Sequence, residues 1–303
     1  MRLIVSYIKQ YFYETNKLIL ALVSLFTGLL VFANYYYGID EHISHSGSFP
    51  VIFTSRYIVF LIAFAGPYLL YTFFKKENYI YHPRFAVLLL IAPAIISIKT
   101  SFNISIDIAA NNNQNEYWNH IIYWPLHLLI IGVILFIIWR TFDTDQPFYV
   151  LKSTGINWKP YLWMLLIMLP LIAAASTQPD FLAMYPKLKT ITGDGGTTLW
   201  QKLLFELSYG TDFISIELFF RGFLILAFIK WAGKDAILPM ACFYCTIHFG
   251  KPLAECISSY FGGIILGVVV YHTRSILGGL IVHLGIAWMM EVGGYISPHV
   301  LRP

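Results

Sequence analysis

The sequence predicts an all-α, polytopic transmembrane helical bundle of about eight or nine spans, and three observations predict it. The chain has 303 residues, of which 58% are hydrophobic and only 12% are charged. A soluble domain carries about a quarter charged residues, so this chain has too few polar groups to cover an aqueous surface. Apolar stretches of roughly 20 residues, enough to cross a bilayer, recur along the whole length. The lipid bilayer is therefore the expected surroundings of the fold.

Nine apolar stretches can be placed from the polar residues that interrupt them. They cover residues 18–37, 57–74, 84–101, 121–140, 160–177, 211–230, 235–249, 254–273 and 276–296. The polar segments 38–56, 102–120 and 178–200 are predicted to be loops, and the asparagine-rich stretch from Asn111 to Asn119 is predicted to face water. We divide the chain into N-terminal transmembrane helices at 1–198 and a C-terminal core of helices at 199–303.

The distribution of lysine and arginine predicts the orientation. With the N-terminus in the cytoplasm, the inner segments hold 12 of the 20 basic residues and the outer segments hold 7, with Arg221 inside a span. This bias follows the positive-inside rule. We expect no cleaved signal peptide, because no short apolar core with a small-residue cleavage site follows the first charged residues. No basic run indicates a nucleic-acid partner.

The three cysteines predict neither a disulfide framework nor a metal centre. Cys242, Cys245 and Cys256 form an odd set within spans. Cys242, Cys245 and His248 lie along one helix face, so a metal is conceivable. A zinc site needs a fourth ligand and usually a turn between cysteine pairs. We therefore expect no metal and no cofactor.

Ionisable residues at bilayer depth mark the candidate site, because each costs about 2.5–3.5 kcal/mol or more to insert. They gather in the last third of the chain: Glu217, Arg221, His248, Glu255, His283 and Glu291. Counted at about 1.5 Å per residue from the inner ends of the spans, their depths overlap in one zone. The spacing predicts that four helices bring these polar groups together.

Each of these residues also has a structural interpretation. Glu217 and Arg221 are four residues apart and can neutralise each other as a buried pair. His248 can cap carbonyls at a helix end, and Glu255 suits the dipole of a first helical turn. His283 lies near Gly278, Gly279 and Gly285, which favour close helix packing. Glu291 can snorkel to the interface.

The chemistry that this set of groups favours is water activation. A carboxylate and a histidine can hold a water molecule and take its proton, and a second histidine can donate to a developing oxyanion. This combination suits hydrolysis of an amide bond inside the membrane without a serine or cysteine nucleophile. The sequence contains no Gly-x-Ser-x-Gly, His-Glu-x-x-His or Walker motif.

The order of these motifs resembles a known family. Ser215 to Phe223 carries Glu-x-x-x-Arg, Ile247 to Gly250 carries a histidine, and Tyr271 to His283 forms a glycine-containing segment that ends in a histidine. Over about residues 199–296 the chain resembles the CAAX prenyl-protease and bacteriocin-processing (Abi) family of intramembrane proteases. The resemblance implies an all-α glutamate-type hydrolase, and a bacterial-type cell membrane is the location that it favours.

The resemblance also implies roles and shows departures. By position, Glu217 matches the second glutamate of a Glu-Glu-x-x-x-Arg motif, and Arg221 matches its arginine. His248 matches the histidine that helps to hold the water, and His283 matches the one that stabilises the oxyanion. Ile216 stands where the family has its water-activating glutamate, Ala287 stands where it has Asn or Asp, and Tyr244 replaces a usual phenylalanine.

Three functional hypotheses follow. The leading one is a membrane-embedded CAAX-protease-like peptidase acting on a peptide or membrane-protein substrate. In it Glu217 or Glu255 is the base, His248 holds the water, His283 donates to the oxyanion and Arg221 fixes Glu217, with one further glutamate as a helper, Glu291. The second is a non-catalytic scaffold or regulator, which Ile216 and Ala287 favour. The third is a proton-coupled transporter; broken helices in matching halves would favour it, and none is evident.

Overall fold

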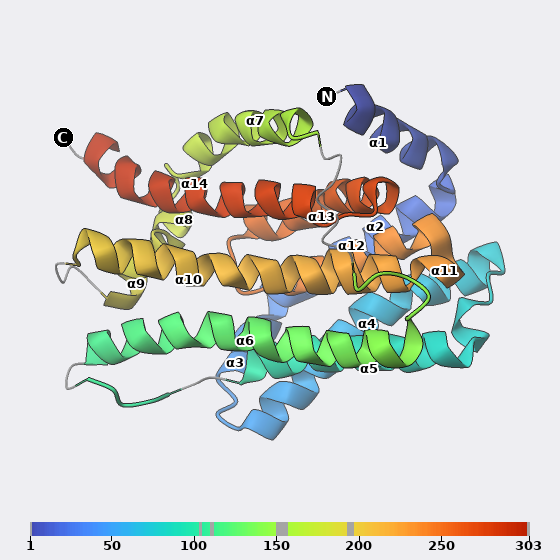
Figure 1. Cartoon of the computed structure of the whole chain (residues 1–303), viewed down its shortest axis with the longest axis horizontal. Helices are drawn as coiled ribbons and strands as arrows, with labels where there is room; N and C mark the ends of the chain where they lie inside the picture. The colour runs from blue at the N-terminus through green and yellow to red at the C-terminus, as the bar shows by residue number, and fades with distance from the viewer. Residues whose placement is uncertain (1, 103–104, 110–111, 150–156, 193–196, 302–303) are drawn as a thin grey trace.

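The computed structural model describes residues 2–102, 105–109, 112–149, 157–192 and 197–301, which are almost entirely helical and contain no strand (Figure 1). Its long helices are α2 (Lys17–Tyr37), α4 (Phe49–Lys75), α5 (Pro83–Ser101), α6 (Asn112–Phe142), α7 (Lys159–Ala175), α10 (Leu199–Glu217), α13 (Leu253–Thr273) and α14 (Leu277–Leu301). Shorter elements are α1 (Arg2–Glu14), α3 (Ile39–Ser44), η1 (Tyr79–Tyr81), α8 (Pro179–Met184), α9 (Lys187–Thr192), η2 (Leu218–Ala227), α11 (Ile229–Ala232), η3 (Gly233–Ala236) and α12 (Ile237–Thr246). The predicted all-α bundle is confirmed.

Six of the described helices are long and apolar enough to cross a bilayer: α2, α4, α5, α6, α13 and residues 277–297 of α14. The other three predicted spans differ in length or form. Helix α7 has 17 residues and α12 has only 10, while the stretch 211–230 is divided between α10 and η2. Leu129, Phe136 and Ile137 on α6 are at least half exposed, which suits side chains in contact with lipid.

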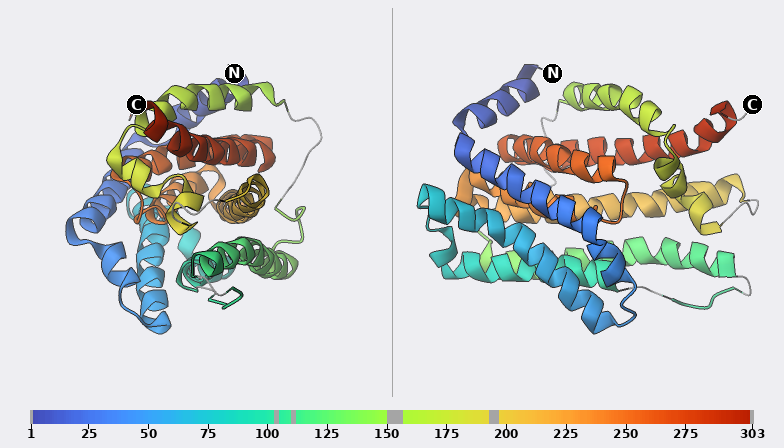
Figure 2. Two further views of the ribbon diagram at one scale, coloured as in Figure 1. Left: turned by 90° about the vertical axis from the view of Figure 1, so that its left-hand side faces the viewer. Right: turned by 180° about the vertical axis from the view of Figure 1, so that it is seen from behind.

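Helices α10 and α14 lie side by side in the middle of the bundle. In Figure 1, α7 covers α14 on one side and α6 covers α10 on the other. Helix α12 packs between α4 and α13 and also contacts α2, which lies at the front in the right-hand view of Figure 2. The N-terminal helices thus surround the C-terminal ones, and the candidate residues lie inside.

Glycines of α14 allow α7 to pack closely, as their positions predicted. A Cβ atom at Gly278 would lie 2.1 Å from the ring of Tyr161, and one at Gly285 would lie 2.6 Å from Leu165. Larger residues at these positions would force the helices apart. Small residues serve this purpose between membrane helices because they let backbones approach.

The predicted asparagine-rich loop is wrong for the residues that the structure describes. Residues 112–119 form the first turns of α6, and Asn111 lies outside the described residues. The side-chain oxygen of Asn115 accepts from the backbone of Ile108 and Ala109, and that of Asn119 accepts from Ile106. The asparagines therefore hold the preceding segment against the helix. The predicted loop at 178–200 likewise contains α8 and α9.

Candidate active site

The centre of the site lies where α10 changes from an α-helix into the π-helix η2. Glu217 is the last residue of α10 and Arg221 lies within η2, and neither side chain is exposed at all. All ten residues of η2 are buried. π-Helical segments are rare and are found frequently at functional sites.

Glu217 and Arg221 form the buried pair that their spacing predicted. Nη1 of Arg221 lies 3.1 Å from Oε1 of Glu217, although the contact lacks the alignment of a hydrogen bond. The guanidinium carbon of Arg221 lies 4.0 Å from the ring centroid of Tyr244, so Arg221 also makes a cation–π contact with this ring. Arg221 therefore lies between the carboxylate of Glu217 and the ring of Tyr244.

His283 on α14 joins the pair and connects it to a third element. Its Nδ1 lies 2.9 Å from Oε1 of Glu217, and its Nε2 lies 3.0 Å from the hydroxyl of Tyr244 on α12. An ionised carboxylate can only accept, so Nδ1 carries the proton and Nε2 accepts from the tyrosine. Gly279, one turn earlier, leaves the necessary space, since a Cβ atom there would lie 2.9 Å from Oε2 of Glu217.

His248 lies just beyond the end of α12, one turn after Tyr244. Its Nδ1 is 3.0 Å from the carbonyl oxygen of Tyr244, and the two rings meet edge to face with centroids 4.7 Å apart. A carbonyl only accepts, so Nδ1 donates and Nε2 retains a lone pair. The predicted capping interaction is present, and it leaves His248 with a nitrogen that can hold a water molecule.

The structure places Glu255 and Glu291 differently from the other four candidates. Both bind the segment 185–187 between α8 and α9. The hydroxyl of Tyr185 donates to Glu255 at 3.1 Å, and the backbone N–H of Lys187 donates to Glu291 at 2.8 and 3.1 Å. Lys251 completes this group, with Nζ 3.0 Å from the Tyr185 hydroxyl and 3.5 Å from Glu255.

The segment 185–187 is packed tightly into the bundle, and these surroundings change the pKa values of two lysines. A Cβ atom at Gly294 would lie 2.5 Å from the backbone of Pro186. Burial and the neighbouring Lys251 lower the pKa of Lys187 to about 8, against the attraction of Glu291. Burial alone would lower the pKa of Lys251, but Glu255 raises it above its ordinary value.

The part of the chain that carries most of these residues matches a known protein family. Residues 199–289 match the family described as type II CAAX prenyl endopeptidase Rce1-like. This part of the chain is therefore similar to that family, and we call residues 199–289 the Rce1-like segment. This match confirms the resemblance and includes five of the six candidates: Glu217, Arg221, His248, Glu255 and His283. No curated protein and no solved structure matches the chain.

Two of the three departures from the family pattern, Ile216 and Ala287, are buried in apolar surroundings. Ile216 is 7% exposed and belongs to the main core cluster. Ala287 is 5% exposed and packs in a cluster that contains Phe205 and Tyr209. Neither position supplies a polar atom to the site.

Sequence reasoning missed two polar residues beside the Rce1-like site. Tyr244 is the first, and its signal was its position four residues before His248. Asp212 is the second; it lies one turn before Ile216, and its carboxylate is 2.7 Å from Nζ of Lys99 on α5. Lys99 lies within a predicted span, so an ionisable group at that depth was the available signal.

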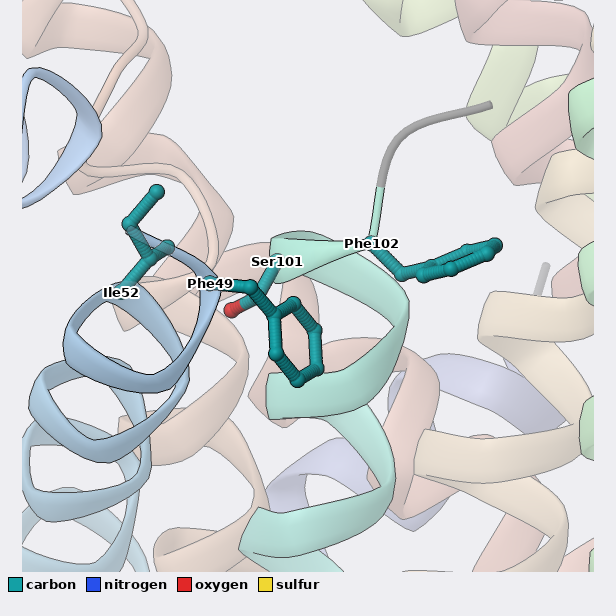
Figure 3. Close-up of a pocket in the computed structure, with 4 residues that line it drawn as sticks. All are labelled: Phe49, Ile52, Ser101 and Phe102. Carbon is teal, nitrogen blue, oxygen red and sulfur yellow. The ribbon is translucent and has the colours of Figure 1, made fainter. Parts of the chain in front are cut away.

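The cysteines and the pocket take no part in the contacts described above. The Sγ atoms of Cys245 and Cys256 are 3.8 Å apart, and no group of three potential metal ligands occurs among the described residues. A pocket of about 440 Å³ lies between the start of α4 and the end of α5, lined by Phe49, Ile52, Ser101 and Phe102 (Figure 3). None of the candidate residues lines it.

Proposed function

We propose that the chain is a membrane-embedded endopeptidase of the CAAX-protease type, which hydrolyses a peptide bond in a peptide or membrane-protein substrate. The observation that carries this proposal is the contact between residues of separate motifs inside the bundle. Glu217 and Arg221 come from one motif and His283 from another, yet Glu217 lies 3.1 Å from Arg221 and 2.9 Å from His283. His248 is adjacent, since its ring contacts the ring of Tyr244. The match of residues 199–289 to an endopeptidase family supports the same conclusion.

The geometry supports a division of labour among these groups. His248 holds the attacking water through its unprotonated Nε2. The Glu217–His283 pair takes the proton of that water, because the carboxylate stabilises the imidazolium that forms. Arg221 holds Glu217 in place, and the buried surroundings strengthen each of these interactions. Glu255 and Glu291 hold the segment 185–187 and act outside the proton transfer.

A non-catalytic scaffold or regulator is the second candidate, and the surroundings of Ile216 and Ala287 favour it. Both positions are apolar and buried, so the water-activating carboxylate of the family has no counterpart at its usual position. In this case the Glu217–Arg221 pair would hold the helices together, and the Rce1-like segment would bind a membrane protein without cleaving it.

The deciding experiment compares new peptide termini in membranes that contain equal amounts of four proteins. These are wild type, Glu217→Gln, His248→Ala and, as a control on an exposed residue of α1, Glu14→Gln. Termini formed by wild type and the control but lost in the two site variants support the peptidase. Identical termini in all four membranes contradict it. Ile216→Glu adds a fifth arm, since cleavage gained only with this variant indicates a disabled site.

The orientation belongs to the same proposal. We place the N-terminus in the cytoplasm of a bacterial-type cell, as the excess of lysine and arginine in the alternate segments favours. A reporter fused before Arg2 that is protected from protease added outside intact cells would agree with this orientation, and digestion of the reporter would contradict it.

A further inference from the structure

His283 has no ring nitrogen left for a substrate. Nδ1 is 2.9 Å from Glu217 and Nε2 is 3.0 Å from the hydroxyl of Tyr244. An imidazole has only these two nitrogens, so a proton that moves between His283 and a reacting atom has to pass through one of the partners. Glu217 is fully buried and paired with Arg221, whereas Tyr244 is 4% exposed, so we assign the contact with the substrate to the Tyr244 hydroxyl.

We propose that Tyr244 is a catalytic residue whose hydroxyl carries protons between His283 and the reacting atoms. This inference rests on the proposed peptidase function and adds a residue to it. The arrangement is a carboxylate, an imidazole and a hydroxyl in series, which is the order that activates hydroxyl groups in hydrolases. Here the hydroxyl passes a proton on instead of attacking the substrate.

The proton transfers balance without any further reactant. A water held by His248 gives one proton to Oη of Tyr244, while Tyr244 gives its own proton to Nε2 of His283. The remaining hydroxide bonds to the carbonyl carbon of the scissile amide, and Glu217 stabilises the imidazolium. When the C–N bond breaks, Nε2 returns a proton to Tyr244 and Tyr244 gives one to the leaving nitrogen. The protein ends in its starting state.

The surroundings of Tyr244 suit this task. Its ring lies under the guanidinium of Arg221, which stabilises negative charge developing on the oxygen. Its main-chain carbonyl fixes the tautomer of His248, so the same residue orients the group that holds the water. The charged and titratable groups that act on it come from five parts of the fold: Glu217, Arg221, His248, His283 and, more remotely, Glu255.

Tyr244→Phe tests the proposal because it removes only the hydroxyl and keeps the ring against Arg221 and His248. The probe is the membrane proteome itself, and the measured quantity is the initial rate at which new peptide termini form, across pH and in H₂O and D₂O. We expect the rate to fall by about 10²–10⁴-fold, the usual contribution of a general acid–base group. We also expect a changed pH profile and a smaller solvent isotope effect, since fewer protons then move together.

Tyr260→Phe is the matched control. Tyr260 is a buried tyrosine of α13 whose hydroxyl lies 3.1 Å from Ser24, and its loss should leave rate, pH profile and isotope effect unchanged. A Tyr244→Phe rate within about threefold of wild type, with the same pH profile, would overturn the relay while Glu217→Gln still abolishes cleavage. Wild-type membranes that form no termini beyond those of Glu217→Gln would overturn the peptidase itself, and the relay with it. If Tyr244→Phe does not fold, wild type in mixed H₂O and D₂O decides: a curved dependence of rate on deuterium content supports the relay, and a linear one contradicts it.

Discussion

The buried Glu217–Arg221 pair predicts how three variants differ in stability. Both side chains are fully buried, and Nη1 and Oε1 are 3.1 Å apart. Removing one partner leaves an uncompensated charge, which costs about 3–5 kcal/mol. Arg221→Met leaves the carboxylate with His283 alone, and Glu217→Gln leaves the guanidinium with the ring of Tyr244 alone. We expect each single variant to be destabilised by that amount.

The double variant Glu217→Gln/Arg221→Met should be far less destabilised than the sum of the single variants. It removes both charges together, and replacing a buried pair by groups of similar volume is often neutral or stabilising. The assay is equilibrium unfolding of the purified proteins in one detergent, followed by tryptophan fluorescence, with the four proteins treated as a double-mutant cycle. A coupling below about 0.5 kcal/mol would mean that the two charges do not depend on each other, and would refute the reasoning.

Three further predictions concern the surroundings of the pair and the segment 185–187. Gly279→Ala places a methyl group 2.9 Å from Oε2 of Glu217, so it should lower stability by about 1–3 kcal/mol and also reduce cleavage. The control Gly262→Ala should change neither quantity, because no atom lies within 4 Å of the added methyl group. Lys187 has a pKa of about 8 in the fold and an ordinary value of 10.5, so the unfolded chain binds more protons between these values. Stability should therefore rise from pH 8 to 10.5, and melting of Lys187→Met over that range should lack this rise. Tyr185→Phe removes the hydroxyl that connects a lysine and a glutamate; it should cost about 1 kcal/mol and speed hydrogen exchange of residues 185–187, and unchanged exchange would contradict its anchoring role.

The parts of the fold that the sequence predicted depend on properties local to one helix. Apolar stretches specify membrane helices because lipid cannot satisfy backbone polar groups, so the bundle followed from composition alone. The contact between Glu217 and Arg221 followed from their spacing within one span. The close packing at Gly278 could also be predicted from the sequence, because small residues in a membrane helix let a neighbouring backbone approach.

The parts that were missed depend on contacts between helices. The hydroxyl of Tyr244 meets His283 only because α12 packs against η2 and α14 packs against α10, which continues directly into η2. The segment 185–187 enters the bundle through hydrogen bonds to Glu255 and Glu291, which are 68 or more residues away along the chain. Asn115 and Asn119 were expected to face water, and they instead bind the backbone of the preceding segment. Pattern and spacing within one element carry no information about such partners.

The absence of a carboxylate at Ile216 is consistent with the contacts of Glu217. Consecutive helical residues point about 100° apart, so residues 216 and 217 cannot both face His283. Glu217 occupies the direction toward α14, and Ile216 points into the core, where a charge would need its own partner. In the proposed peptidase, the series Glu217, His283 and Tyr244 connects the carboxylate to the water that His248 would hold. The proposed relay would make an acid at 216 unnecessary, and it would account for an apolar residue there.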